Sequence, residues 1–323
     1  MRRTAVLGLI LALTAVVDVP HGRAGDFPSQ PIRLIIGFPP GSAADITARI
    51  VGAAMSETLG QQVVVESRPG AGSSLAAEFV ARAPADGYTL FIGTASNLTG
   101  AAINPNLRLD FAKDFAPVTP LTVLPLILAV HPSLGVSSVK ELIELARSKP
   151  GELTYASVGP GTVPHLSTEL FSVRAKIKLV HVPYQGSPPA VTDLLAGRVS
   201  MMLGVASTIM PHVEAGRLKA LASSSAKRAH FAPNLPTMAE AGLPDFEAGV
   251  WFGLVTPAGT PRAVIDKLNA AANAALASEE VVGKLRAQGF EPLGGPPDEF
   301  ARFVARETVK WAAAAEAAGL KKQ

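Results

Sequence analysis

The chain has 323 residues, of which 48% are hydrophobic and 17% charged, and its formal net charge is +3. This length is long for one domain and sufficient for two, and the composition is that of a globular protein, not a disordered one. There is no cysteine, which excludes disulfides, thiol nucleophiles and cysteine-based metal or iron–sulfur sites.

Residues 1–24 have the pattern of a secretory signal peptide. Arg2 and Arg3 precede an apolar run over residues 5–17, and small residues at Gly22 and Ala24 suit cleavage after Ala24. An uncleaved anchor is the alternative. The segment holds three arginines and one aspartate, a net +2, which leaves +1 for the rest of the chain. We therefore predict export to a bacterial periplasm and no nucleic-acid partner.

The next segment predicts a buried strand, a rigid turn and a helix start. Residues 32–37 are mostly apolar and β-branched, and Pro39, Pro40 and Gly41 follow. Ser42 or Asp45 is expected to cap a helix that ends at Gly60. Free backbone N–H groups at such a helix start favour an anion. An anion site and an ordinary strand–helix connection both remain open here.

A glycine-rich segment over residues 67–74 follows a second short strand. It does not match G-x-G-x-x-G, because Leu75 stands at the third glycine, nor the P-loop pattern. We therefore interpret it as a turn that leads into a helix. A further strand over residues 88–93 then ends in a polar loop at residues 94–97.

A second series of alternating strands and helices begins after an apolar run at residues 121–130. Alternation of this kind predicts a parallel sheet covered by helices on both faces. Thr162 and Ser187 are expected to cap helices of this series. The expected strands are 153–156, 179–182, 199–203, 220–223 and 246–255, and the expected helices are 139–148, 164–171, 188–196, 261–277, 279–288 and 297–318.

No catalytic motif is present. A triad of Ser157, His165 and Asp45 is conceivable, but no spacing supports it. Four loops at strand ends instead share a small, polar character and contain neither lysine nor arginine: 38–45, 94–97, 157–165 and 184–188. Such loops would bind a carboxylate through backbone N–H groups, hydroxyls and helix dipoles.

The ordered set of short motifs resembles the Bug family of extracytoplasmic solute-binding proteins, the substrate receptors of tripartite tricarboxylate transporters. The matching segments are 31–41 with Asp45, 59–61, 68–72, 86–90, 165–171, 182–186, 193–195 and 235–242. The resemblance implies an α/β, type II periplasmic-binding-protein fold, with two α/β lobes joined by two crossing strands near residues 125–130 and 249–255. The expected division is 1–24 as signal peptide, 25–124 with 249–323 as the first lobe, and 125–248 as the second.

By this resemblance the cleft between the lobes holds a small organic carboxylate, and the protein is expected to be a monomer without catalysis, cofactor or metal. Its partner would be a membrane permease or a signalling protein, and an exported serine hydrolase using Ser157 and His165 is the remote alternative. The ligand-binding residues expected from family motifs and loop position are Phe38, Gly41, Ser42, Ala43, Asp45, Thr94, Asn97, Ser157, Gly161, Thr162, His165, Tyr184 and Gly186.

Three positions depart from the family pattern. Ser42 replaces a common glycine, Gln185 a common basic residue and Ser200 a common aspartate. Gln185 and Ser200 are expected at the far side of the cleft, where they would affect recognition of the distal end of the ligand.

Overall fold

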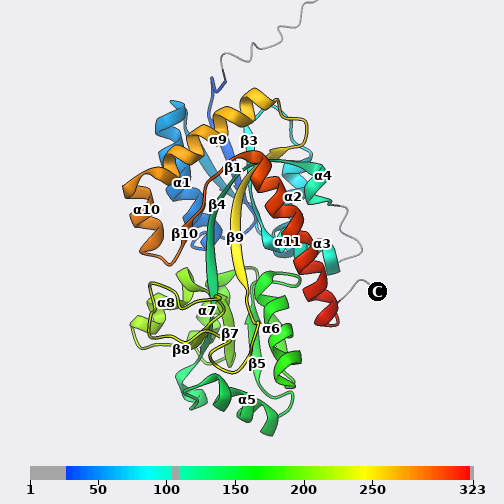
Figure 1. Cartoon of the computed structure of the whole chain (residues 1–323), viewed down its shortest axis with the longest axis vertical. Helices are drawn as coiled ribbons and strands as arrows, with labels where there is room; N and C mark the ends of the chain where they lie inside the picture. The colour runs from blue at the N-terminus through cyan, green and yellow to red at the C-terminus, as the bar shows by residue number, and fades with distance from the viewer. Residues whose placement is uncertain (1–26, 104–108, 321–323) are drawn as a thin grey trace, which may run out of the picture.

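The computed structural model describes residues 27–103 and 109–320, so the predicted signal peptide lies outside the described residues. The elements form two groups, stacked along the long axis and connected by the strands β4 (Phe115–Val130) and β9 (Gly249–Pro257) (Figure 1). We call these groups the first lobe, which holds β1–β3, and the second lobe, which holds β5–β8.

The first lobe is built on parallel strands that continue into antiparallel ones. The central strand β1 (Ile32–Ile36) pairs in parallel with β2 (Val63–Ser67) and β3 (Thr89–Thr94). Strand β3 then pairs antiparallel with β9, and β9 with β4, so the order is β2-β1-β3-β9-β4. The short β10 (Glu291–Pro292) pairs with the other side of β4.

Strand β4 belongs to both lobes. Its first part pairs with β9 as far as Pro125, and from Leu126 onward it pairs with β7 (Met201–Val205). The second-lobe sheet continues through β5 (Thr154–Ser157) to β6 (Val180–Pro183), and β8 (Lys219–Ser223) pairs with β4 on the other side.

Helices cover both lobes and supply most of the remaining core. The C-terminal helix α11 packs mainly against α3 and β4 and also touches α6 (Figure 1). In the part of the chain that is described, no helix has the length and hydropathy needed to cross a membrane. The first-lobe helices are α1 (Ala43–Leu59), α2 (Ser74–Ala81), α3 (Ala95–Ile103), α4 (Phe111–Asp114), α9 (Arg262–Ala277), α10 (Glu279–Arg286) and α11 (Pro297–Ala317), with the 3₁₀ turn Ala71–Ser73. Those of the second lobe are α5 (Val139–Ser148), α6 (Val163–Ala175), α7 (Ser187–Leu195) and α8 (Ala206–Glu214), with the 3₁₀ turn Pro132–Leu134.

Ser224 ties the two connecting segments together where the chain returns to the first lobe. Its hydroxyl accepts from Leu126 N (2.8 Å) and donates to Ala248 O (2.5 Å). Its backbone N–H donates to Leu126 O, and its carbonyl accepts from Ala248 N. The four hydrogen bonds of this buried serine therefore join β4 to the segment that enters β9.

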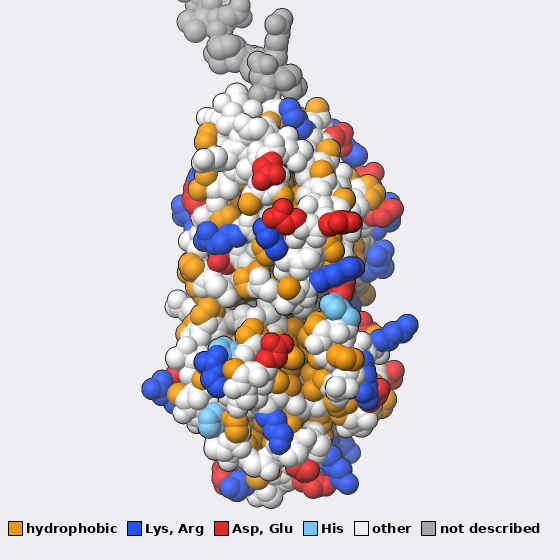
Figure 2. All heavy atoms as spheres, turned by 90° about the vertical axis from the view of Figure 1, so that its left-hand side faces the viewer, with side chains coloured by type: hydrophobic (Ala, Val, Ile, Leu, Met, Phe, Trp, Pro, Cys, Tyr) orange, Lys and Arg blue, Asp and Glu red, His pale blue; other side chains and the backbone are white. Residues whose placement is uncertain are grey.

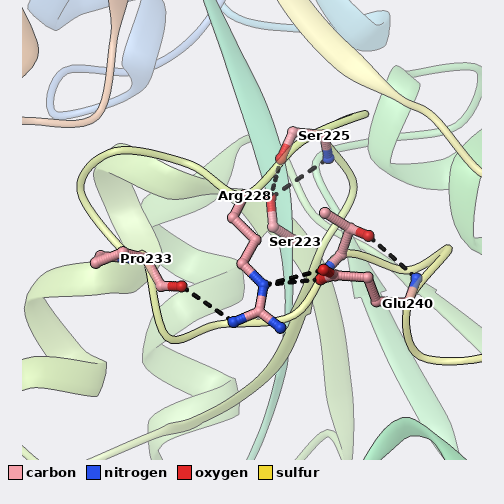
Figure 3. A network of polar contacts seen from close by, with 6 residues as sticks. Ser223, Ser225, Arg228, Pro233 and Glu240 are labelled. Carbon is pink, nitrogen blue, oxygen red and sulfur yellow. Dashed lines mark hydrogen bonds and ion pairs between the residues drawn. The ribbon is translucent and has the colours of Figure 1, made fainter.

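The irregular segment between Ser224 and β9 is held by its own polar network (Figure 3). Arg228 donates to both carboxylate oxygens of Glu240 and to the carbonyl of Pro233. Glu240 and Thr237 cap each other, since each backbone N–H donates to the other's side chain. These bonds satisfy backbone groups that no strand or helix pairs.

Two local predictions were wrong, and one helix that contributes to the site was missed. Residues 94–97 do not form a polar loop, because α3 begins at Ala95 directly after β3. Ser187 is the first residue of α7 and not its cap, which is Gly186. Helix α8 was not predicted at all; its nine residues follow β7 without a connecting loop.

Candidate functional site

The N-terminal ends of five helices meet at one small cavity between the lobes. Its volume is about 30 Å³, and among the described residues its lining includes no charged side chain. The first lobe contributes the starts of α1 and α3, and the second lobe those of α6, α7 and α8. The residues at these helix starts that line the cavity are Ser42, Ala43, Ala44, Thr94, Ser96, Pro164, Ser187 and Val205, and Phe38, Val158, Val250 and Phe252 complete the wall.

The start of α1 is fixed by hydrogen bonds within its own loop. Ser42 is the N-cap, and its hydroxyl accepts from Asp45 N at 3.3 Å. The carboxylate of Asp45 in turn accepts from Gly41 N (3.0 Å) and pairs with Arg49 (2.8 Å). Asp45 therefore holds the loop in place, while the backbone N–H groups of Ala43 and Ala44 are left for a ligand, as in any first helical turn.

The start of α3 is fixed in a similar way. Thr94 N donates to Asn97 Oδ1 and Ser96 N donates to Thr94 Oγ1, both at 3.0 Å. Asn97 is fully buried, and its Nδ2 has no hydrogen-bond partner within the described residues. Ser96 Oγ accepts from Val163 N of α6 at 3.4 Å, so the two lobes touch here.

The loop before α6 is held by two stacked histidines, of which His165 is buried. Gly161 N donates to His165 Nδ1 (3.1 Å), and the His165 ring stacks on His181 with 4.2 Å between centroids. Burial lowers the pKa of both histidines to about 4, and for His181 the neighbouring His165 adds to the effect. Both rings are therefore neutral at neutral pH, which His165 needs in order to accept from Gly161.

Beneath this pair, Tyr155 stacks on His181 and donates its hydroxyl to Glu169. Burial, followed by the hydrogen bond to Glu169, raises the pKa of Tyr155 above its usual value. Ser157 Oγ lies 2.6 Å from His181 Nε2 and accepts from Gly159 N. These contacts hold the loop before α6 in place from within the second lobe.

A second cavity of about 140 Å³ lies next to the small one, and the two share Phe38 and Val158. Tyr184 is on its second-lobe side and donates its hydroxyl to Asp193 at 2.7 Å. The pKa of Tyr184 is raised to about 12 by burial and by this bond, so the ring is neutral. The other residues that line this larger cavity are Gly37, Gly70, Ala71, Gly72, Ser73, Gly159, Pro160, Pro183 and Gln185.

The lobes are in contact around these cavities. Thr99 of the first lobe donates to Gly161 O. A Cβ added to Gly186 would lie 2.6 Å from Pro39 Cδ, so only glycine allows this approach. Gly72 meets Pro160 with similarly little room. On the face shown in Figure 2 the outline narrows at the junction of the lobes, and charged side chains of both signs are scattered over both.

The structure brings some of the predicted site residues to the cavities and places others behind them. Phe38, Ser42, Ala43 and Thr94 line the small cavity, and Tyr184 lines the larger one with Phe38. The remaining eight are not among the lining residues of either cavity; they support the loops or make contacts between the lobes: Gly41, Asp45, Asn97, Ser157, Gly161, Thr162, His165 and Gly186.

Several lining residues were not predicted. The glycine-rich turn that supplies Gly70–Ser73 was noticed, but only as a failed phosphate loop. Val205, Val250 and Phe252 carry no signal that separates them from core residues. The expectation for Ser200 was wrong: it precedes β7 and bonds to Thr154, at the end of the strand opposite to Val205.

The arrangement does not support the hydrolase alternative. Ser157 is fully buried and is absent from the lining of both cavities. Its hydroxyl contacts His181, whereas His165 accepts from a backbone N–H. A nucleophile must reach its substrate, and this serine lies behind the loop that it stabilises.

Two lobes that share a sheet and enclose an uncharged cleft lined by the N-terminal ends of helices are typical of a solute-binding protein. Residues 47–320 match the model of the tripartite tricarboxylate transporter family receptor. The chain belongs to this family, as the sequence resemblance predicted.

Relatives and solved structures agree with this assignment. BugT of Bordetella pertussis is 37% identical, covering 99% of this chain and 98% of its own. A protein in the tcbD-tcbE intergenic region of Pseudomonas sp. strain P51 is 40% identical, covering 96% and 92%.

Among solved structures, Rpa4515 of R. palustris with adipate has 39% identity and a TM-score of 0.90, covering 92% of this chain and 100% of its own. The periplasmic binding protein BugD has 31% identity and a TM-score of 0.88, with the same coverage. MatC of Rhodopseudomonas palustris with bound malate has 33% identity and a TM-score of 0.85, covering 89% and 99%. The predicted fold class is confirmed.

Proposed function

We propose that the protein captures a small organic carboxylate between its lobes and delivers it to the permease of a tripartite tricarboxylate-type transporter. The observation that carries the proposal is the convergence of five helix N-termini on a cavity without charged side chains among the described residues. Each helix start stabilises an anion by roughly 0.3–1 kcal/mol when exposed and by more when partly buried.

The comparisons support the same chemistry. Two neighbours in the family have adipate and malate bound, and both ligands are small organic carboxylates. BugD is a periplasmic binding protein, which agrees with the export that residues 1–24 predict. Both observations support the proposal that this protein acts in the periplasm as a binding protein without catalysis. A signalling protein in place of a permease is the alternative partner, and the neighbouring genes would distinguish the two.

The carboxylate requirement is tested by calorimetry on the chain from residue 25 onward. Hexanoate and hexanamide have the same carbon skeleton, so a site built for an anion binds the acid and not the amide. Ser187→Ala removes a hydroxyl that lines the small cavity and makes no capping bond. We expect an affinity about tenfold lower, the effect of losing one hydrogen bond to a charged group.

Ser133→Ala is the matched control, because this exposed hydroxyl contacts only the nearby His131. If the amide binds as tightly as the acid across a panel of small acids, the proposal is wrong. Equal affinities for Ser187→Ala and the unchanged protein would show that the start of α7 does not bind the ligand.

A further inference from the structure

The larger cavity continues the small one, because Phe38 and Val158 line both. A carboxylate bound at the helix starts can therefore extend the rest of the molecule toward Tyr184 and Gln185. Gln185 is exposed and Tyr184 half-buried, so this cavity forms the mouth of the cleft. The chemistry of the mouth then selects the distal end of the ligand.

No ionised side chain belongs to the mouth, within the residues that the structure describes. The nearest arginine along the chain, Arg68, lies over the ring of Phe79 at 3.8 Å from its centroid. Arg198 is paired with Asp193 at 2.7 Å, and that carboxylate also accepts the Tyr184 hydroxyl. Neither arginine is among the residues that line the mouth.

The hydroxyl of Tyr184 is also unsuited to a second anion. Since its proton is donated to Asp193, it offers only acceptor lone pairs to the cavity. Ser73 is fully buried against Gly37, and its hydroxyl, which has no hydrogen-bond partner within the described residues, supplies one neutral donor and no counter-ion. The Gln185 amide is the other polar side chain of the lining, and it suits a neutral polar group or none.

We infer that the ligand is a monocarboxylate with an uncharged tail, held by its carboxylate at the helix starts and by its tail at the mouth. The inference rests on the proposed function and adds the substrate class. A second carboxylate would lose part of its hydration at the mouth without gaining a counter-ion. An uncharged tail instead packs on Phe38, Val158 and Tyr184 and gains from the burial of its apolar surface.

The test measures affinities by calorimetry for acids paired by length: butyrate with succinate, hexanoate with adipate, octanoate with suberate, and benzoate with terephthalate. In the best-binding pair we expect the monocarboxylate to bind at least about tenfold more tightly than the dicarboxylate. A dicarboxylate that binds equally or more tightly overturns the inference and leaves the proposed function intact. If none of the eight acids binds, the proposed function fails as well.

Gln185→Lys supplies the missing counter-ion at an exposed position, where folding does not depend on the side chain. We expect the dicarboxylate of the best pair to gain about tenfold in affinity, while the monocarboxylate stays within about twofold. Gln62→Lys is the control, because this substitution adds the same charge as Gln185→Lys. Gln62 is exposed and lies at the end of β2 that is farther from the cleft. A gain for both acids in either variant would indicate general attraction and contradict the role of the mouth.

Discussion

The stacked histidines of the second lobe make stability depend on pH in a predictable direction. The pKa of His165 is lowered by burial from 6.5 to about 4, so the folded protein takes up a proton less readily than the unfolded chain. The contribution of neutral His165 to the free energy of unfolding is therefore complete above pH 6.5 and is lost as the pH falls toward 4. Protonation would also remove the lone pair that accepts from Gly161 N.

The magnitude follows from the two pKa values. For one histidine with these values, the free energy of unfolding at pH 5 is lower by about 2 kcal/mol than at pH 7. His181 has a similarly lowered pKa and lies 4.2 Å from His165 between ring centroids, so the two protonations oppose each other. Removing His165 should therefore remove about 2 kcal/mol of the pH dependence and also ease the protonation of His181.

The substitution His165→Asn tests this, because it removes the imidazole while the asparagine Oδ1 still accepts a hydrogen bond from Gly161 N. Urea unfolding of the unchanged protein and the variant at pH 7 and pH 5 gives four free energies. We expect the fall between the two pH values to be smaller in the variant by about 2 kcal/mol. If the free energy of unfolding falls equally between pH 7 and pH 5 in His165→Asn and in the unchanged protein, the reasoning is refuted.

Two further substitutions test the contact between the lobes and the hydrogen bonds between the segments that connect them. Gly186→Ala should weaken ligand binding at least about tenfold, because its Cβ meets Pro39 of the opposite lobe. Gly135→Ala, another glycine with positive φ but open space around it, should leave the affinity unchanged in the same calorimetry. Ser224→Ala should lower the free energy of unfolding by about 1–3 kcal/mol, since it leaves Leu126 N unpaired. Ser225→Ala, whose hydroxyl contacts only Ser223, should cost less than half as much in the same urea titration.

Helix boundaries that are marked by a capping residue could be predicted from the sequence. Ser42 caps α1 and Gly60 ends it in the left-handed conformation, as the motif indicated. Ser138 caps α5 in the same manner. These boundaries depend on bonds within a few residues, so a local pattern contains the information that determines them.

The helices α3 and α8 escaped prediction for a physical reason. Each begins at the residue after a strand ends, without a connecting loop. In α8 the N-cap is Val205, whose side chain makes no capping bond. In α3 the polar residues around Ser96 are typical of a loop, although their side chains bind the first helical turn. Two of the five helix starts at the site therefore carried no recognisable local signal.

The site residues show the same division between local and long-range information. Asp45 was predicted as a ligand-binding residue from its place in the motif, but its carboxylate holds Gly41 and Arg49, and Asp45 is not among the residues that line the cavities. Gln185 was noticed as a departure from the family pattern, yet its position at the mouth depends on how the lobes meet. Which polar residues face a cleft is decided by contacts between the lobes, which no single stretch of sequence contains.

The distribution of helix starts between the lobes links binding to closure. The first lobe supplies two positive helix ends and the second lobe three. Brought together without an anion, these ends repel each other, whereas a carboxylate between them is attracted to all five. Under the proposed function, a carboxylate would therefore favour the closed arrangement over an open one by its differential interaction with the two. Contacts such as Pro39 with Gly186 could then be small, because the anion itself would draw the lobes together.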